Sequence, residues 1–338
     1  MTRPDSAPSV VLLTGGVGGG RFARGLATVA AERGHDLTAI VNVGDDTWLT
    51  GLRVCPDLDS VMYALAGVND TDRGWGRAGE STRVGAELAA YGVGWPWFTL
   101  GDLDLGTHIA RTALLREGRS LTEATGVVNA RWQTGVDLLP VTDDEAETWV
   151  EFMGDDGMSQ QVHFEEWWVR HRAAVPTTAF VHRAPRGATV SPQVTEALAH
   201  ANVILLAPSN PVVSIGAMLH VGGLRQAIRR SPAPVVGLSP VIGGRALRGM
   251  AEVCCAVEGI DCTSDGIARH YGARRDGGLL DGWLMDECDE AASEPLGELG
   301  MTVRAIPLLM SDDTSTEAMA EEALDLGAAL TRVPEEAL

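Results

Sequence analysis

The feature that most constrains the fold lies near the N-terminus, where a buried strand, a glycine cluster, a helix and a second strand follow one another. The apolar run from Val10 to Leu13 predicts the first strand, and TGGVGGGR follows it at 14–21. An apolar helical stripe then continues to Gly34, which would end the helix. The run LTAIVNVGDD predicts the second buried strand. This order is typical of the opening unit of a doubly wound parallel sheet.

Strand and helix patterns continue to alternate along the chain. Strands are expected at 95–100, 179–182, 203–210 and 233–240, and helices around 83–91, 107–117, 193–201 and 214–230. The alternation predicts an α/β fold with a Rossmann-like three-layer core and a mostly parallel sheet, plus an inserted, largely helical segment.

The expected domain boundaries follow from where this pattern changes. The catalytic core would comprise 8–117 and 176–310, and the insertion at 118–175 would cover the site. Residues 311–338 would form a C-terminal helix with a solvated acidic face.

The charge balance limits the partners that the chain can bind directly. Lys and Arg total 26 against 46 Asp and Glu, a formal net charge of −20. Nucleic acid and anionic membranes need a basic face, so neither is expected as a partner. Phosphorylated ligands stay compatible, because backbone amides and bound cations can hold them. The cysteines are odd in number and form no C-x-x-C pair, which predicts free thiols. The sequence also shows no apolar leader and no membrane-spanning run, so we expect a cytoplasmic protein.

The glycine cluster is a candidate phosphate or nucleotide site. Glycines between a strand and a helix let the backbone approach a ligand, and the helix N-terminus directs N–H groups at negative charge. No Gly-Lys-Ser/Thr follows, so the segment is not a P-loop. Gly18, Gly20 and Ala23 fit the dinucleotide spacing G-x-G-x-x-A, but the second strand does not end in the lone ribose-binding acid of an NAD site. A purely structural turn is the alternative.

Acidic residues gather where the second predicted strand ends. Asp45, Asp46, Asp57 and Asp59 are expected on loops at the carboxyl edge of the sheet, where open α/β proteins bind ligands. Hard carboxylate oxygens suit Mg²⁺ bound to a substrate diphosphate. We expect a functional role for Asp45 and Asp59. For Asp46 and Asp57, capping a helix or holding a turn is an equal alternative.

The motif LGDLDLGTH at 100–108 adds a third group of candidates. Asp102 and Asp104 are expected to end a strand, and Thr107 and His108 to begin a helix, where the imidazole could meet a ligand. A structural role for His108 is an equal alternative.

Two later strand-to-helix motifs, APSNPVVSIG and SPVIGGRALRGMA, offer further ligand contacts. Ser209 and Asn210 can hydrogen-bond a base or ribose, or form only a capping turn. The main-chain amides of Ser214 and Ile215 at a helix start can bind a phosphate. The second motif adds a glycine turn at Gly243 and Gly244.

In combination, these motifs resemble the 2-phospho-L-lactate transferase family. The matching segments run in order from residue 15 to about 251: GGVGGGRF, VNVGDDTWLTGLRVCPDLDSVMYAL, DRGWG, LGDLDLGTHIART, PSNPVVSIG and SPVIGGRALRGMA. The chain is more similar still to the actinobacterial branch, the phosphoenolpyruvate transferases of coenzyme F420 biosynthesis. Leu103 is a departure, because many relatives have a basic residue there.

The resemblance implies a Mg²⁺-dependent, homodimeric enzyme with a Rossmann-like core and two substrates. The acceptor would be the deazaflavin Fo. The donor would be a guanylyl-activated three-carbon acid, either enolpyruvyl-diphospho-guanosine or, as in archaea, lactyl-diphospho-guanosine. The products would be GMP and dehydro-F420-0, or F420-0 from the lactyl donor.

The resemblance also distributes roles among the candidate residues. Asp45 and Asp59 would be the metal ligands and catalytic carboxylates, with Asp59 orienting or deprotonating the acceptor hydroxyl. The donor would be held by Gly15, Gly16, Gly18, Gly19, Ser209, Asn210, Pro211, Ser214, Ile215, Gly243 and Gly244. The acceptor would lie against Asp57, Asp59, Asp102, Asp104, Thr107 and His108.

Two other classes of protein stay open. Non-catalytic regulators that bind uridine-diphosphate sugars resemble the same fold, but they show P-x-G-D-[IL]-R where this chain has CPDLDS at 55–60. An NAD-dependent oxidoreductase is indicated only by the dinucleotide-like glycine spacing, and the sequence offers no identifiable acid or base for hydride transfer.

Overall fold

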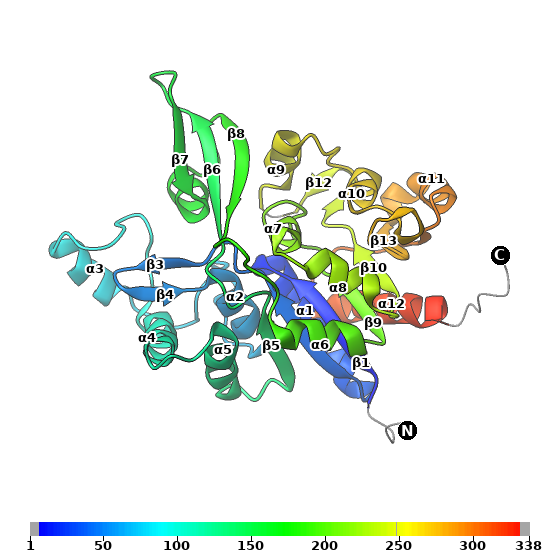
Figure 1. The fold of residues 1–338 in the computed structure, drawn as a ribbon, viewed down its shortest axis with the longest axis horizontal. Helices are drawn as coiled ribbons and strands as arrows, with labels where there is room; N and C mark the ends of the chain where they lie inside the picture. Colours follow the sequence, from blue (N-terminus) through cyan, green and yellow to red (C-terminus); the bar gives the residue numbers. More distant parts are fainter. Residues whose placement is uncertain (1–6, 248, 332–338) are drawn as a thin grey trace.

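A seven-stranded parallel sheet forms the centre of the molecule in the computed structural model, which describes residues 7–247 and 249–331 (Figure 1). In spatial order its strands are β14 (Thr302–Ile306), β13 (Gly282–Asp286), β10 (Val235–Leu238), β9 (Val203–Leu206), β1 (Ser9–Thr14), β2 (Asp36–Val41) and β5 (Val136–Pro140). Val10 to Leu13 and all four residues of β9 are buried, as expected for strands covered on both faces. The predicted α/β fold with a mostly parallel sheet is confirmed.

Helices cover both faces of this sheet because the strand order reverses between β1 and β9. Helix α1 (Gly16–Glu32) connects β1 to β2 and packs against α2 (Pro56–Leu65) and α12 (Asp313–Thr331). On the way to β9 and β10 the chain forms α6 (Pro192–His200) and α8 (Leu224–Arg230), which pack together. Right-handed connections that run in opposite directions along a sheet place their helices on opposite faces.

Some glycines of α1 serve helix packing and not ligand approach. A Cβ on Gly20 would lie 3.3 Å from the backbone of Ser60 and Val61 in α2. A Cβ on Gly25 would lie 2.7 Å from the side chain of Thr316 in α12. These two positions let three helices pack closely on one face of the sheet.

The segment expected to be a largely helical insertion contains three strands besides its helical turns, so that part of the prediction is wrong. Helix α5 (Leu121–Ala130) leads into β5, which is the edge strand of the central sheet. A separate antiparallel sheet follows, formed by β7 (Ser159–His163), β6 (Glu147–Met153) and β8 (Thr177–Arg183), and it projects from the core (Figure 1). Burial alternates along β6, which is the two-residue period of a strand. The helix-like EWWVR forms only a π-helical turn, η1 (Glu166–Arg170).

Two further expectations about strands are corrected by the structure. Residues 95–100 form turns, because Pro96 lacks an N–H for a ladder and the rings of Trp95 and Trp97 stack at 4.8 Å. The strand expected at 179–182 is part of β8 and lies outside the central sheet.

The remaining elements surround this framework. They are the strand pairs β3 (Thr47–Leu49) with β4 (Leu52–Val54) and β11 (Val241–Ile242) with β12 (Arg245–Ala246), the helices α3 (Arg83–Ala90), α4 (Asp102–Arg116), α7 (Ile215–His220), α9 (Ala251–Glu258), α10 (Ser264–Tyr271) and α11 (Ser293–Glu298), and the 3₁₀ turns η2 (Arg274–Asp276) and η3 (Glu287–Ala292). The expected C-terminal helix corresponds to α12, and 332–338 lie outside the described residues. Across the described part of the chain, no helix combines the length and apolarity needed to span a bilayer.

Candidate active site

The loops after β1 and β9 are tied together at the carboxyl edge of the sheet. The Gly15 N–H donates to Ser209 Oγ (3.3 Å), and the Ser209 hydroxyl donates to the Gly15 carbonyl oxygen (2.8 Å). A Cβ on Gly19 would overlap the hydroxyl groups of Thr14 and Ser209. The structure therefore brings three of the predicted donor-binding residues together, at the point where doubly wound folds bind ligands.

A carboxylate is bound at the N-terminus of α1. The Gly16 N–H donates to Asp57 Oδ1 at 2.7 Å, and the N-cap residue Gly15 has no side chain of its own to cap the helix. A Cβ on Gly15 would lie 2.5 Å from Asp57 Oδ2 and 3.2 Å from Ser214 Cβ. Asp57 thus lies where helix N-termini bind anions, with Ser214 beside it.

Asp57 and Asp59 lie in the first turn of α2 and not on a loop, which corrects the expectation from the sequence. Residues two apart on an α-helix point about 200° away from each other, since each residue turns the helix by about 100°. The two carboxylates therefore belong to different surroundings.

Asp45, Asp57 and Glu165 are buried carboxylates whose charges raise one another's pKa values, and we call them the acidic cluster. The side-chain amide of Asn42 joins two of its members, donating to Asp57 Oδ2 (2.9 Å) and Asp45 Oδ1 (3.4 Å). The same amide donates to the main-chain oxygen of Val213 (3.3 Å). None of the three carboxylates forms an ion pair with a described residue.

Burial and mutual repulsion raise the pKa values throughout the acidic cluster. Burial raises the pKa of Asp57 to about 6, against the opposing hydrogen bonds from Asn42 and Gly16. Burial, and then the charge of Asp57, raises the pKa of Glu165 to about 8. The pKa of Asp45 is raised well above its usual range by burial, then by Asp57 and Glu165. The group is unfavourable when fully ionised without a cation.

Asp59 lies instead in a buried ion network with residues of α4. The Arg111 guanidinium donates to both carboxylate oxygens of Asp59, with Nη1 3.0 Å from Oδ2. His108 lies between two acids, with Nδ1 3.4 Å from Asp59 Oδ2 and Nε2 3.4 Å from Asp104 Oδ2. The Tyr63 hydroxyl donates to Asp104 Oδ1 at 2.7 Å. In this network each carboxylate has a hydrogen-bonding partner.

Two groups of acids can be compared as sites for a divalent cation. Ligand atoms of Asp59, Asp104 and His108 lie within 4.8 Å of one another. Arg111 already neutralises Asp59, however, and Mg²⁺ prefers oxygen ligands to imidazole. The acidic cluster offers only carboxylate oxygens and has no ion-pair partner among the described residues, but its three carboxylates do not approach one another this closely. Asp45 and Asp59 belong to different groups, and their joint binding of Mg²⁺ stays a prediction.

Asp102, Asp104, Thr107 and His108 all belong to α4, which corrects the expectation that Asp102 and Asp104 end a strand. Acids in the first turn of a helix are favoured by its dipole. The Asp102 carboxylate accepts from the main chain (2.9 Å) and hydroxyl (2.8 Å) of Ser81. Thr107 and His108 are buried inside α4 and do not begin it.

The later glycine and asparagine motifs have structural partners of their own. Asn210 Oδ1 accepts from the N–H groups of Val212 (2.9 Å) and Val213 (3.1 Å), so this side chain shapes the loop that leads to α7. Gly243 and Gly244 form the turn between β11 and β12, both with positive φ. Their roles in donor binding stay predictions, as do those of Gly18, Pro211 and Ile215.

Three residues at the site were not singled out from the sequence. Asn42 directly follows β2, and its amide connects the acidic cluster. Arg111 lies three residues after His108 and seven after Asp104, which is the helical spacing that places all three on one face of α4. Glu165 lies in the EEWW segment, where the tryptophans were the more prominent feature.

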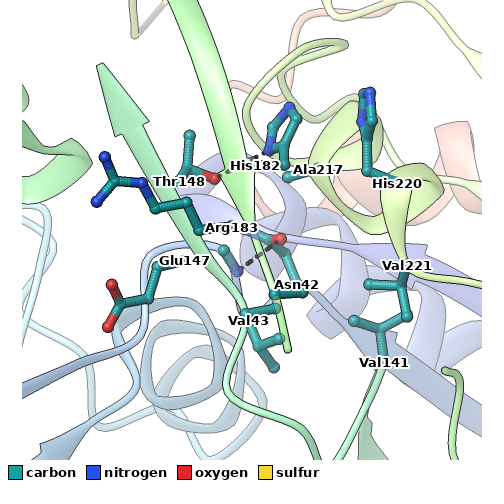
Figure 2. Close-up of a pocket in the computed structure, with 13 residues that line it drawn as sticks. Asn42, Val43, Val141, Glu147, Thr148, His182, Arg183, Ala217, His220 and Val221 are labelled. Carbon is teal, nitrogen blue, oxygen red and sulfur yellow. Dashed lines mark hydrogen bonds between the residues drawn. The ribbon is translucent and has the colours of Figure 1, made fainter. Parts of the chain in front are cut away.

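A cavity of about 120 Å³ extends the site beyond Asn42. Figure 2 shows Thr148, His182 and His220 around it, with Asn42 on the side of the core. The imidazole rings of His182 and His220 stack at 4.1 Å, and His182 Nδ1 lies 3.3 Å from Thr148 Oγ1. Burial, and then His220, lowers the pKa of His182 to about 4. The stacked rings connect β8 of the antiparallel sheet with α7 of the core.

Comparison with known proteins identifies the family. The family model described as 2-phospho-L-lactate transferase CofD matches residues 10–298. The chain belongs to this family. Its prediction from the sequence motifs is confirmed, and so is the prediction that the protein is a transferase.

Several curated relatives of this family are similar over nearly their full length. Phosphoenolpyruvate transferases from Mycobacterium avium and Mycolicibacterium smegmatis are each 48% identical to the chain, covering 94% of it and 98% of the relative. The phosphoenolpyruvate transferase of Nocardia farcinica is also 48% identical, with 96% of each chain covered. Among solved structures, a UPF0052 family protein from Bacillus halodurans matches with a TM-score of 0.61 at 18% identity, covering 95% of this chain and all of that one. The last similarity shows the shared fold alone.

Proposed function

We propose that this protein transfers the phosphoenolpyruvyl group of enolpyruvyl-diphospho-guanosine to the deazaflavin Fo, giving dehydro-F420-0 and GMP. The observation that carries the proposal is the contact between the glycine turn of α1 and Asp57, which places an anion-binding helix end beside carboxylates that lack a cation. A diphosphate and a divalent cation together complement this pair of features. The relatives named phosphoenolpyruvate transferase support the enolpyruvyl donor.

The main chain and small side chains of the two tied loops would hold the donor. The N-terminus of α1 is formed by Gly15 and Gly16, and Ser209 contacts it. Ser214 is close by, because a Cβ built on Gly16 would lie 4.0 Å from its Oγ. Asp45 and Asp57 would hold Mg²⁺, which supplies charge neutralisation at the diphosphate when it is bound. The residues of the site then act mainly by positioning the donor for in-line attack by the terminal ribityl hydroxyl of Fo.

We propose a positioning role for Asp59 in place of proton removal. Arg111 donates a hydrogen bond to each of its carboxylate oxygens, which fixes the position and orientation of the carboxylate. Asp59 and Asp57 lie in the same turn of α2, so the ion network fixes the helix that presents Asp57. The predicted acceptor contacts Asp104 and His108 belong to the same network. They would support the acceptor surface from behind.

The antiparallel sheet would cover the site, and the enzyme would act as a cytoplasmic homodimer. Glu165 lies between β7 and β8, and the charge of Asp57 contributes to its raised pKa, which supports the covering role. The five cysteines are free thiols, as is usual in a reducing compartment. Size-exclusion chromatography with light scattering tests the dimer directly.

A direct assay tests the reaction. Purified protein is incubated with Fo, MgCl₂ and either donor, and the products are separated and weighed by mass spectrometry. We expect a product heavier than Fo by one phosphoenolpyruvyl group, with an equal amount of GMP. A preference for the lactyl donor would assign the archaeal-type reaction instead. No product with either donor, together with tight binding of a uridine sugar nucleotide, would indicate a regulator.

Variants connect this assay to the site. Asp57→Asn should lower turnover at least about 100-fold, because it removes a carboxylate from both the helix terminus and the cation. Asp325→Asn is a matched control on α12, where the carboxylate is about half exposed and pairs with Arg33. Comparable turnover in the two variants would remove Asp57 from the proposed mechanism.

A further inference from the structure

A row of aromatic rings connects the loop before α4 with the antiparallel sheet. The rings of Trp95 and Trp97 stack 4.8 Å apart at an angle of 15°. The ring of Trp95 lies 6.2 Å from the imidazole of His163 in β7. Trp149 faces His163 across the β6–β7 pair, with the ring centroids 6.0 Å apart, and the guanidinium of Arg183 lies 4.1 Å from the Trp149 ring. The row therefore ends in the sheet at Trp149 and in the loop at Trp97.

Trp97 has one face that no described aromatic ring covers. Trp95 stacks on the other face, and the ring of Phe98 lies 5.8 Å from Trp97 and 6.1 Å from Trp95. Because these two distances are similar, Phe98 lies beside the stack and not on the second face of Trp97. Trp95 and Phe98 also pack against Leu105 and its apolar neighbours, but Trp97 is not part of that group and is only half-buried. The pair of indoles therefore offers a flat, preformed surface.

The row lies beside the candidate active site at two points. Leu105, which packs with Trp95, follows Asp104 of the buried ion network on α4. His163 Nδ1 accepts from the main-chain N–H of Glu165 (3.2 Å), a member of the acidic cluster. The stack thus packs on α4 and on the antiparallel sheet, next to both groups of buried acids.

We propose that the free face of Trp97 is the stacking surface for the planar deazaflavin ring of the acceptor. The inference rests on the proposed function, in which Fo is the acceptor. A planar heteroaromatic ring is stabilised by stacking on an indole, and an indole already held flat by a second one loses little freedom when a ligand binds. The ribityl chain separates the ring of Fo from the hydroxyl that would react, so the ring has to be bound apart from the diphosphate. A surface beside the acidic cluster, but not part of it, meets that requirement.

The guanine base of the donor is also planar, but the position of the stack favours the acceptor. The donor phosphates would lie at the tied loops that follow β1 and β9, where Gly15 and Ser209 hydrogen-bond each other. The stack contacts α4 and β7 instead. The experiment below distinguishes the two rings.

The test compares two surface tryptophans in the full-length protein, with Fo alone and GMP alone as probes. Trp97→Leu removes the aromatic face and keeps an apolar side chain, whereas Trp97→Phe keeps a smaller aromatic face. Trp75→Leu is the matched control, because Trp75 is 41% exposed and lies outside the row, with the Arg73 guanidinium 4.4 Å from its ring. Fluorescence titration measures the affinity for each probe. Circular dichroism and melting temperatures check that each variant is folded.

We expect Trp97→Leu to weaken Fo binding at least about 5-fold, the lower end of what stacking on an aromatic side chain contributes. Trp97→Phe should recover most of this loss, and Trp75→Leu should stay within about twofold of the wild type. In the turnover assay Trp97→Leu should raise the KM for Fo and leave kcat and the affinity for GMP nearly unchanged. Wild-type Fo affinity in Trp97→Leu would overturn the inference. A loss of GMP affinity in place of Fo affinity would overturn it too, by assigning the stack to guanine.

The outcome is separable from that of the proposed reaction. If the wild type converts Fo but Trp97→Leu binds it equally well, the reaction stands and the stacking surface is refuted. If Fo affinity depends on Trp97 but neither donor yields a product, the stacking surface stands and the proposed reaction is refuted. A wild type that does not bind Fo would refute both.

Discussion

Replacing Arg111 with methionine should strongly destabilise the protein, because it leaves Asp59 in the interior without its cation. The two residues are 1% and 4% exposed, and the guanidinium binds both carboxylate oxygens. Removing one partner of a buried ion pair costs about 3–5 kcal/mol. At roughly 2 °C per kcal/mol for a chain of this size, Arg111→Met should melt about 6–10 °C below the wild type.

A double-mutant cycle separates the pair from its surroundings. Asp59→Asn alone leaves a buried guanidinium that is only half paired, so it should also lower the melting temperature. The double variant removes both charges together and should therefore recover part of the loss, with a coupling energy of about 2–3 kcal/mol. Because Asp59→Asn lowers stability, a fall in its activity cannot by itself assign a chemical role to Asp59.

An exposed ion pair of similar length is the control. Arg24 and Asp313 lie 2.8 Å apart, but their side chains are 45% and 65% exposed. Arg24→Met should change the melting temperature by no more than about 1 °C, since water screens such pairs. Differential scanning calorimetry at constant pH and salt measures all four variants. An equally small effect of Arg111→Met, or a double variant whose loss equals the sum of the two single losses, would refute the reasoning.

Two other predictions concern the glycine turn and the histidine stack. Gly15→Ala should weaken GMP binding at least about 10-fold, because the added Cβ would displace Asp57. Gly18→Ala should be tolerated, because a Cβ there would lie 3.7 Å from its nearest neighbour, the Pro208 oxygen. Fluorescence titration of both variants with GMP checks this, and equal affinities would contradict it. The folded pKa of His182 lies near 4, below its ordinary value of 6.5, so its contribution to stability is complete above pH 6.5 and is lost as the pH falls towards 4. His182→Phe, which can still stack on His220, should flatten the acid side of the melting profile over that range, and an unchanged slope would show that another group titrates there.

The parallel core could be predicted from the sequence because strands covered on both faces are continuous apolar runs. Val10 to Leu13 in β1 show this pattern, and a glycine turn and an amphipathic helix follow at the expected spacing. The antiparallel sheet was missed because each of its strands has one exposed face, so polar residues interrupt the apolar pattern. In β6 only every second residue is buried, a period of two that is easily taken for a loop in a short segment.

The sequence predicted where the candidate aspartates lie better than it predicted their partners. Sequence spacing placed several aspartates at the carboxyl edge of the sheet, and there Asp57 accepts from Gly16 and shares the amide of Asn42 with Asp45. Which aspartate joins which group depends on the rotation of α2 about its axis, since Asp57 and Asp59 point in nearly opposite directions. Glu165 lies in the helical turn between β7 and β8, far from α2 in the sequence, and no local pattern relates it to Asp57.

The buried acids of this protein are distinguished by their counter-ions more than by their burial. Asp46 and Asp59 are as buried as Asp57, but each has an arginine within hydrogen-bonding distance. Among the described residues, Asp57 and the other members of the acidic cluster have no such cation. Burial without a cation favours the neutral, protonated form of a carboxyl, which is why the pKa values of Asp57 and Glu165 are raised. A divalent cation bound beside the N-terminus of α1 would stabilise the ionised form of Asp57, and the helix end would hold the diphosphate of the proposed donor next to it.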